Sequence, residues 1–304
     1  MKVLVIGSEG QLGTDVVLAF TRNGHDVLGL THRDTEISDE AFLTERILPL
    51  RPDLIVNTAA MHHVENCEKD PLKAFAVNAF GCRYLASLAQ ELHAKLMHVS
   101  TDYVFDGSKK SPYLEEDAPL PLNVYGCSKL AGEYFVRTGA DRHFVIRTSA
   151  IYGLNPCRAK GGLNFVELML KLARERGEVR VVNSEFVSPT STEELAAQMA
   201  ALAETEWYGL YHATAEGSCS WHEFAAEIFR LTDTPVNLKI AAANEFPAKV
   251  PRPQYSVLEN ARLKRLGLNK FTSWQSGLRS YLARRAAMAQ PAAPASPQAY
   301  AASS

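Results

Sequence analysis

The chain has 304 residues, of which 46% are apolar and 22% charged; this is close to the average for a globular protein, and the length suggests about two domains. Its formal net charge is −2 and it has no basic run, so charge gives no support for binding nucleic acid or an anionic membrane. Five dispersed cysteines without a CxxC pair argue against a disulfide framework or zinc cluster and favour a reducing, cytoplasmic location. No apolar segment approaches the length of a membrane span.

Short apolar segments alternate with helical patterns over the first half of the chain. This alternation predicts an α/β fold, with a doubly wound parallel sheet of Rossmann type covered by helices on both faces. The expected strands are Lys2–Ile6, Asp26–Leu30, Leu54–Asn57, Leu96–Ser100 and Phe144–Arg147, and the expected helices are Gln11–Asn23, Asp39–Leu50, Pro71–Leu92 and Asn123–Thr138.

A glycine-rich segment, Gly7-Ser8-Glu9-Gly10-Gln11-Leu12-Gly13, follows the first expected strand and opens the first expected helix. Glycines let the backbone turn tightly and approach a pyrophosphate, and the free N–H groups at a helix start attract its charge. A tight strand–helix turn without a ligand is the structural alternative. The position between a strand and a helix at the N-terminus favours cofactor binding.

The second expected strand runs into Thr31-His32-Arg33-Asp34. An acid at the strand tip would bind the adenosine ribose and favour NAD, whereas Arg33 is suited to the 2′-phosphate of NADP. Asp34 lies slightly further along the chain, so NAD is still possible as the cofactor. A solvated polar turn without a role in binding accounts for Arg33 equally well. The sequence leans toward NADP(H) over NAD(H).

Tyr125 and Lys129 are four residues apart in an expected helix, which places both on one face. A free tyrosine has a pKa near ~10, and a neighbouring ammonium lowers it. A surface pair is the ordinary interpretation of this spacing by itself. Thr101, however, lies at the carboxyl end of an expected strand, where open α/β sheets bind ligands and a hydroxyl can orient a carbonyl. Glycine segment, strand-end hydroxyl and Tyr/Lys pair are far more specific together than separately.

The pattern loosens after about residue 150. We predict an NAD(P)-binding domain over residues 1–150, a smaller, mainly substrate-binding α/β domain over 151–287, and a disordered tail over 288–304 that is rich in Ala, Pro, Ser and Gln. We leave open that later segments return to the first domain. The expected later elements are helices at Leu163–Arg176, Glu193–Glu204, Ser220–Leu231, Arg262–Leu266 and Trp274–Arg285, and a strand at Gly209–Ala213.

The chain resembles the extended short-chain dehydrogenase/reductases, and within them the dTDP-4-dehydrorhamnose reductase family, from Met1 to about Arg285. The resemblance implies NAD(P)H-dependent reduction of the C4 ketone of a nucleotide-linked 6-deoxy-4-keto sugar. It is carried by Gly10-Gln11-Leu12-Gly13, Arg51-Pro52-Asp53, Asn57-Thr58-Ala59-Ala60, Ser100-Thr101-Asp102-Tyr103-Val104-Phe105-Asp106-Gly107, Pro121-Leu122-Asn123-Val124-Tyr125-Gly126, Lys129-Leu130-Ala131-Gly132-Glu133, Arg147-Thr148-Ser149, Pro189-Thr190, Gly209-Leu210-Tyr211-His212 and Arg252-Pro253.

The resemblance also implies residue roles. Tyr125 would donate the proton to the sugar C4 oxygen, Lys129 would bind the nicotinamide ribose and tune Tyr125, and Thr101 would polarise the ketone. The implied binding residues are Gly7, Gly10, Gln11, Leu12 and Gly13 at the pyrophosphate, Ala59 and Ala60 beside the cofactor, Asp102 and Tyr103 near the sugar, and Arg252 at the nucleotide diphosphate, where a structural ion pair is an equal alternative.

Two departures from the family pattern bear on the substrate. Ala150 stands where the family often has a Trp that contacts the sugar, and the following loop from Gly153 to Gly162 is long. Some members share a dimer-bridging magnesium. Asp15 and Glu193 could serve, but Arg284 and Arg285 stand where a third acid is expected. We therefore predict no metal, and we leave a homodimer open.

Two alternatives to a reductase are open. A sugar-nucleotide epimerase or dehydratase shares the glycine segment and the Tyr/Lys pair. Dehydratases use an Asp-Glu pair after the strand-end Thr, whereas Thr101 is followed here by Asp102 and Tyr103, which favours a reductase. A non-catalytic role is the other alternative, because the regulatory subunit of methionine adenosyltransferase also resembles this family.

Overall fold

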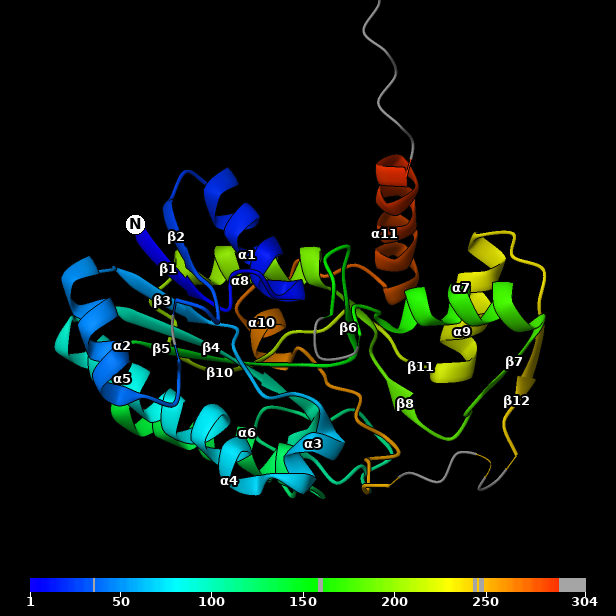
Figure 1. Cartoon of the computed structure of the whole chain (residues 1–304), viewed down its shortest axis with the longest axis horizontal. Helices are drawn as coiled ribbons and strands as arrows, with labels where there is room; N and C mark the ends of the chain where they lie inside the picture. The colour runs from blue at the N-terminus through cyan, green and yellow to red at the C-terminus, as the bar shows by residue number, and fades with distance from the viewer. Residues whose placement is uncertain (35, 158–160, 243–244, 246–248, 290–304) are drawn as a thin grey trace, which may run out of the picture.

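The computed structural model describes residues 1–34, 36–157, 161–242, 245 and 249–289. Six parallel strands form its central sheet in the order β10-β5-β4-β3-β1-β2 (Figure 1). This confirms the predicted doubly wound parallel sheet. The strands are β1 (Lys2–Ile6), β2 (Asp26–Leu30), β3 (Leu54–Asn57), β4 (Lys95–Thr101), β5 (His143–Thr148) and β10 (Gly209–His212).

Helices cover both faces of this sheet because its strands present apolar side chains alternately to each side. On one face Val3 and Val5 pack with α1 (Gln11–Arg22) and α8 (Thr192–Ala203). On the other face Leu4 and Ile6 belong to a second core, which α2, α5 and α6 complete. The bounds of these three helices are Glu40–Ile47, Gly81–Glu91 and Val124–Gly139.

The direction of winding changes at β1, which lies between β2 and β3. The loops that leave the carboxyl ends of β1 and β3 therefore diverge, and open α/β sheets bind ligands at such a point. The glycine segment follows β1, and Thr58 to Ala60 follow β3. Both predicted cofactor-binding segments thus lie at the switch point.

The helix expected over Pro71–Leu92 is interrupted. The structure has α4 (Pro71–Phe75), a π-helical turn over Ala76–Phe80, and then α5. Asn78 in the π turn donates through Nδ2 to the Met61 carbonyl (2.9 Å) and to Ser128 Oγ (3.0 Å), and its Oδ1 accepts from the Met61 N–H (2.8 Å). A π turn re-aims side chains within a helix, and here it points a buried amide at the loop after β3.

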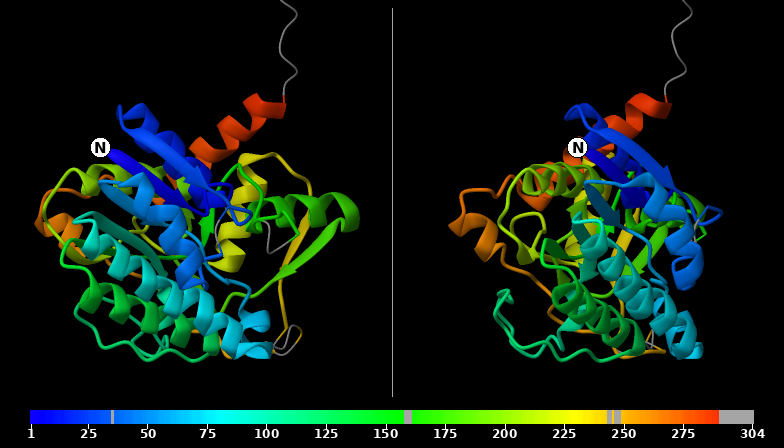
Figure 2. Two further views of the ribbon diagram at one scale, coloured as in Figure 1. Left: turned by 60° about the vertical axis from the view of Figure 1, so that its left-hand side comes forward. Right: turned by 90° about the vertical axis from the view of Figure 1, so that its left-hand side faces the viewer.

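Segments beyond residue 150 take part in both lobes, so residue 150 is not a clean boundary. Side chains of α8, β10 and α10 (Ala261–Arg265) lie in the same core as β1 and α1. The second lobe has a core of its own, built from α7, α9 and α11 (Figure 2). These helices span Phe165–Arg176, Trp221–Leu231 and Trp274–Ala289.

Three two-stranded pairings in the second half were absent from the sequence prediction. Each strand is two to four residues long, too short to show a hydrophobic period. The short helix α3 (Val64–Lys69) was also missed. The pairs are β7 (Glu178–Val181) with β12 (Asn237–Ile240), β8 (Phe186–Val187) with β11 (Cys219–Ser220), and β6 (Ile151–Tyr152) with β9 (Thr190–Ser191).

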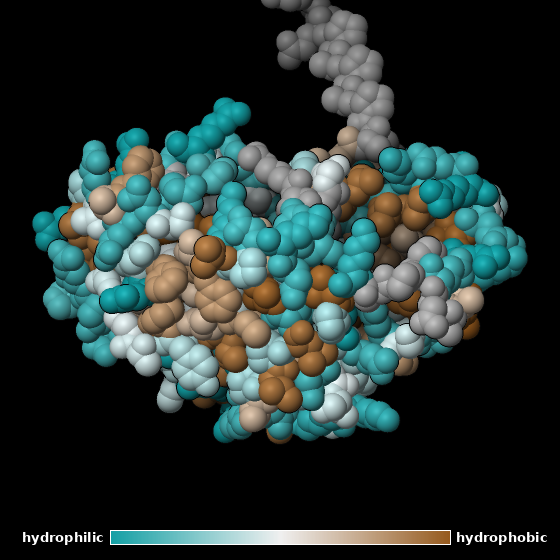
Figure 3. Space-filling view, turned by 60° about the horizontal axis from the view of Figure 1, so that its bottom comes forward, coloured by the Kyte–Doolittle hydropathy of each residue, from teal (hydrophilic) through white to brown (hydrophobic). Residues whose placement is uncertain are grey.

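The chain end differs from the expected start of the tail. Helix α11 continues through Met288 to Ala289, and the remainder of the predicted tail, residues 290–304, lies outside the described residues. Among the residues that the structure describes, no helix is both long and apolar enough to cross a membrane. On the face shown in Figure 3, polar residues interrupt the apolar patches.

Candidate active site

The glycine segment forms a compact turn that only glycine accommodates at two points. Gly7 has a φ of 81°, and the N–H groups of Gly7 and Ser8 donate to the Leu30 carbonyl at 2.9 and 3.2 Å. A Cβ at Gly13 would collide with the Gly7 carbonyl oxygen. Gly10 caps α1 without a side-chain hydrogen bond, so the first N–H groups of this helix have no capping side chain. Such a helix start fits a pyrophosphate.

The segment after β3 is held directly against this turn. Thr58 donates to the Ile6 carbonyl through its N–H (3.0 Å) and its hydroxyl (2.8 Å), and the Ala59 N–H donates to Asn57 Oδ1 (3.1 Å). A Cβ at Gly7 would lie 3.0 Å from the Ala59 nitrogen. The structure therefore brings Ala59 to the glycine turn, as the sequence predicts, with Ala60 next to it.

Gln11 and Leu12 point their side chains elsewhere. Gln11 Nε2 donates to the carbonyls of Asn155 (3.1 Å) and Gly153 (3.5 Å), which ties the loop after β6 to the start of α1. Leu12 is buried in the core that α1 shares with α8. The cofactor contact predicted for these two residues would therefore involve their backbone at the start of α1.

Arg33 lies in an exposed turn beyond the carboxyl end of β2. The Asp34 carboxylate accepts hydrogen bonds from the Thr31 hydroxyl (2.7 Å) and N–H (2.9 Å), and these bonds lower the pKa of Asp34. Asp34 is thus occupied in its own turn. The guanidinium of Arg33 forms no ion pair with any described residue.

The first turn of α6 packs closely on the turn that follows β4. Asn123 caps the helix by accepting from the Gly126 N–H (2.9 Å), and a Cβ at Gly126 would collide with the Tyr103 carbonyl oxygen. The rings of Tyr103 and Tyr125 meet edge to face, with their centroids 5.8 Å apart. Thr101 lies close enough to the Tyr125 hydroxyl to lower the pKa of this phenol. The structure thus brings Thr101, Tyr103 and Tyr125 together.

The pKa of Tyr125 moves in the direction opposite to the one that the Tyr/Lys spacing predicts. Burial raises it, the hydrogen bond with Thr101 lowers it, and the charge of Asp102 raises it further. Lys129 is itself buried and donates to the Val99 carbonyl (2.7 Å), and its Nζ lies 3.1 Å from His98 Nε2. Burial lowers the pKa of Lys129, and burial together with the Lys129 charge lowers that of His98.

A buried ion pair holds α6 against β4 and β5. Glu133 and Arg147 form two hydrogen bonds, Nε to Oε1 at 2.9 Å and Nη2 to Oε2 at 2.7 Å, and Glu133 also accepts from the Ser100 hydroxyl. Arg147 is 1% and Glu133 0% exposed. The pair fixes the helix that carries Tyr125 and Lys129, and no short-range sequence signal indicates it.

Asp102 does not face an open site. It is 4% exposed, and its carboxyl accepts hydrogen bonds from the hydroxyls of Thr101 (3.0 Å), Ser149 (2.9 Å) and Ser256. The Asp102 carboxyl is thus engaged within the chain, and the sugar contact implied for Asp102 stays a prediction. Sequence analysis missed Ser256, which comes from a segment 154 residues further along.

Arg252 forms the ion pair that was considered for it, and its diphosphate contact stays a prediction. Its Nη2 pairs with Glu65 Oε1 at 2.6 Å while the side chain stays 35% exposed. Burial lowers the pKa of Arg252, but the charges of Tyr103 and Glu65 raise it overall. An ion pair and a contact with an anionic ligand are therefore compatible at this position.

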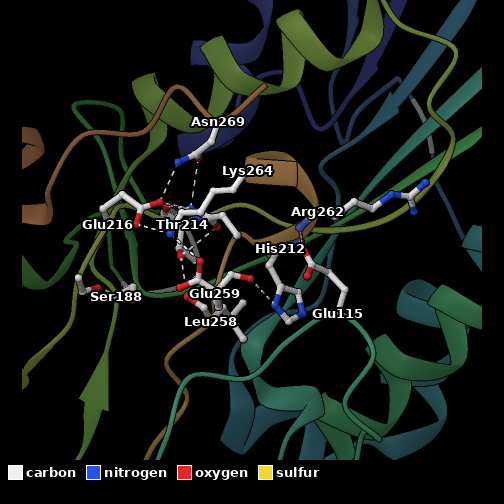
Figure 4. A network of polar contacts seen from close by, with 12 residues as sticks. Glu115, Ser188, His212, Thr214, Glu216, Leu258, Glu259, Arg262, Lys264 and Asn269 are labelled. Atoms are coloured by element: carbon white, nitrogen blue, oxygen red, sulfur yellow. Dashed lines mark hydrogen bonds and ion pairs between the residues drawn. The ribbon is translucent and has the colours of Figure 1, made fainter. Parts of the chain in front are cut away.

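A polar network around the end of β10 holds the segment near Asn260 that returns from the second lobe (Figure 4). Glu115 Oε1 accepts from the N–H groups of His212 (3.2 Å) and Arg262 (3.1 Å), and Asn260 donates to the Thr214 carbonyl at 2.8 Å. Burial lowers the pKa of His212 to about 3, so this imidazole is neutral at pH 7. The network anchors the end of the segment that carries Arg252 and Ser256.

The acids considered for a metal are engaged with other side chains. Glu193 pairs with Arg284, and Asp15 accepts from the Thr192 hydroxyl. Burial raises the pKa of Asp15. Within the described ranges, no group of three or more His, Cys, Asp and Glu side chains is arranged to hold a metal ion.

We expect treatment with a chelator to leave the catalytic rate unchanged, because Arg284 already neutralises Glu193. The measurement is the initial rate before and after dialysis against EDTA. A rate that falls and is restored by added magnesium would contradict this prediction.

Comparisons with known proteins agree with the class that the fold and the site define, an NAD(P)H-dependent oxidoreductase on a Rossmann-type sheet. The family model described as "RmlD substrate binding domain" matches residues 1–287. The chain belongs to that family.

The relatives span almost the whole chain. The spore coat polysaccharide biosynthesis protein SpsK of Bacillus subtilis (strain 168) is 38% identical over 284 residues, covering 93% of this chain and 98% of SpsK. The dTDP-4-dehydrorhamnose reductase of Escherichia coli (strain K12) is 34% identical, covering 93% and 97%. The crystal structure of dTDP-4-dehydrorhamnose reductase from Bacillus anthracis str. Ames in complex with NADP is 35% identical, with a TM-score of 0.89, covering 93% of this chain and 99% of that one.

Proposed function

We propose that this protein uses NAD(P)H to reduce the C4 ketone of a nucleotide-linked 6-deoxy-4-keto sugar. The substrate that we propose is dTDP-4-dehydro-L-rhamnose, which would give dTDP-L-rhamnose. The observation that carries the proposal is the meeting of the Thr101 and Tyr125 side chains at the carboxyl end of β4, on the same edge of the sheet as the glycine turn. Relatives named dTDP-4-dehydrorhamnose reductase support the choice of substrate.

Tyr125 is the proposed proton donor to the C4 oxygen. Burial raises the pKa of its phenol, so the hydroxyl stays protonated at neutral pH and loses its proton only in strongly basic solution. A phenol that is protonated at neutral pH can act as a general acid, and a positioned general acid contributes roughly 10²–10⁴-fold to a rate. Thr101 is the proposed second hydroxyl at the ketone.

The cofactor is held by backbone and by charge in this proposal. Gly7, Gly10 and Gly13 shape the turn that admits the pyrophosphate, and Ala59 and Ala60 flank the cofactor. Lys129 is proposed to bind the nicotinamide ribose through its buried ammonium. The bound reduced nicotinamide supplies the hydride, and the chain supplies position and the proton.

At the substrate end, Tyr103 and Arg252 are the proposed contacts. Tyr103 is half-buried and packs against Tyr125, and Arg252 has a partly exposed side chain whose guanidinium suits a diphosphate. Tyr103 also occupies the position where a dehydratase would carry its second carboxylate. A panel of nucleotide-linked 4-keto sugars, compared by kcat/KM, tests this assignment, and a preference for a substrate without a diphosphate would contradict it.

We expect Arg33→Ala to weaken NADPH binding roughly tenfold and NADH binding little, because a charge-assisted contact with a phosphate is worth about 1.5–3 kcal/mol. Arg33 is exposed beyond β2, and Asp34 is occupied by Thr31. The measurement is the Kd of each cofactor by titration, with Arg22→Ala at the far end of α1 as the control. Equal losses for both cofactors, or a wild type that strongly prefers NADH, would remove the argument.

A further inference from the structure

The Asp102 carboxyl joins three parts of the chain directly behind the candidate catalytic hydroxyls. Oδ1 faces the Thr101 hydroxyl at the end of β4 (3.0 Å). Oδ2 accepts from the hydroxyls of Ser149, which follows β5 (2.9 Å), and Ser256, which lies in the segment returning from the second lobe. Asp102 is buried, so these three hydroxyls take the place of water around its carboxyl.

The direction of the Thr101 hydrogen bond decides what this hydroxyl can do, because a hydroxyl has one hydrogen to donate. An ionised Asp102 only accepts, so Thr101 donates to it and can only accept from Tyr125. Both hydroxyl hydrogens then point away from a ketone. The Tyr103 N–H also donates to Thr101 Oγ1 (3.2 Å). In this state Thr101 accepts from Tyr103 and Tyr125, so its oxygen has no further lone pair to offer.

A proton on Oδ1 reverses this chain of hydrogen bonds. Asp102 then donates to Thr101, and the hydrogens of Thr101 and Tyr125 become available to a ketone oxygen. The two serine hydroxyls keep donating to Oδ2 in either state, and so they assign the proton to Oδ1.

We propose that Asp102 is a positioning residue whose carboxyl, by donating to Thr101, orients the Thr101 and Tyr125 hydroxyls toward the substrate carbonyl. This inference rests on the proposed reduction of a ketone at these hydroxyls. It assigns Asp102 a role that needs no contact with the sugar.

The surroundings of Asp102 favour its protonated form. Burial raises its pKa, against the lowering effect of the hydrogen bonds from Ser256, Ser149 and Thr101. The two arginines near Asp102 form ion pairs with other residues. Arg147 on β5 is paired with Glu133, and Arg252, on the segment of Ser256, is paired with Glu65 and acts on Tyr103. The phenols of Tyr103 and Tyr125 also lie beside it, and burial raises the pKa of both.

Replacing Asp102 by Asn keeps a donor to Thr101 but removes the group that titrates. The serine hydroxyls would hold the amide oxygen, so the amide N–H₂ would face Thr101 and donate to it at every pH. We expect Asp102→Asn to keep kcat within about tenfold of wild type, and Asp102→Ala, which donates nothing, to lose roughly 10²-fold or more. Asp106→Asn is the matched control, because Asp106 lies in the same turn and bonds Ser108 and Tyr113 instead.

The dependence of kcat/KM on pH distinguishes positioning from a structural role. Wild type should lose activity as pH rises through the pKa of Asp102, and Asp102→Asn should lack this basic limb. Ser256→Ala removes a donor to the carboxylate, so it should raise the pKa and move the limb upward by about one pH unit. A structural role would lower the activity without changing the shape of the profile.

Infrared spectroscopy of the protein without substrate, recorded as a function of pH, measures the protonation state of the Asp102 carboxyl independently of turnover. We expect a carboxyl band that is absent in Asp102→Asn and titrates at higher pH in Ser256→Ala. A wild-type limb that persists in Asp102→Asn, equal losses in the Asn and Ala variants, or a band that does not move in Ser256→Ala would overturn the inference. Normal infrared titration in a wild type that reduces no 4-keto sugar would instead refute the proposed function.

Discussion

Replacing Tyr125 by Phe is expected to lower kcat by roughly 10²–10⁴-fold, the contribution of a positioned general acid. The substitution removes only the hydroxyl that lies beside Thr101 and keeps the ring that packs edge to face with Tyr103. Cofactor affinity should therefore stay within about twofold of wild type. Steady-state turnover and a cofactor binding titration measure the two effects separately.

Tyr134→Phe provides the matched control, because Tyr134 lies on the same helix and is 52% exposed. It should turn over like wild type. Full activity in Tyr125→Phe would contradict the assignment of Tyr125 as the proton donor, and a parallel loss of cofactor affinity would show that the hydroxyl acts in binding.

Replacing Glu133 by Ala is expected to destabilise the protein by about 3–5 kcal/mol, because it leaves the Arg147 guanidinium buried without its partner. Both side chains are almost completely buried, and the Ser100 hydroxyl loses its acceptor at the same time. The measurement is the free energy of unfolding in denaturant. Since the pair holds α6 in place, turnover should fall together with stability.

The control for this variant is Glu175→Ala, which removes an exposed ion pair with Lys171 on α7. Exposed pairs of this spacing contribute about 0.3–0.5 kcal/mol, so its unfolding curve should nearly overlay that of wild type. Similar losses in Glu133→Ala and Glu175→Ala would contradict the importance given to burial.

Local patterns in the sequence predict the central sheet and the glycine turn well. The apolar segments of β1 and β3 are buried strands as expected, and Gly7 and Gly13 occupy places where a side chain would collide. These features depend on neighbours in sequence or on a regular period, which is the information that a single sequence carries.

Long-range contacts could not be predicted in the same way. Two partners of Asp102 come from the residue that follows β5 and from a segment 154 residues away, and a serine in a loop carries no signal of such a contact. The ammonium of Lys129 bonds the Val99 carbonyl and lies beside His98, which helix spacing does not reveal. Burial then reverses the expected pKa shift of Tyr125, because desolvation depends on the whole fold.

No single motif predicts the reaction class. The glycine segment, Thr101 and the Tyr125/Lys129 pair predict it when they are considered together. Ala150 adopts a left-handed backbone conformation with a φ of 45°, at the position where the family often has a Trp. Its small side chain offers no stacking surface to a sugar. We therefore expect this position to affect which keto sugar is accepted.

The measurement that tests the central claim most directly is the stoichiometry of the reaction with dTDP-4-dehydro-L-rhamnose and NADPH. The cofactor is followed by its absorbance and the sugar nucleotide by chromatography and mass. The proposed chemistry predicts one NADPH consumed for each 4-hydroxy sugar nucleotide formed, with a gain of two hydrogens. A dehydrated or epimerised product without net consumption of cofactor, or no turnover of any nucleotide-linked 4-keto sugar, would contradict it.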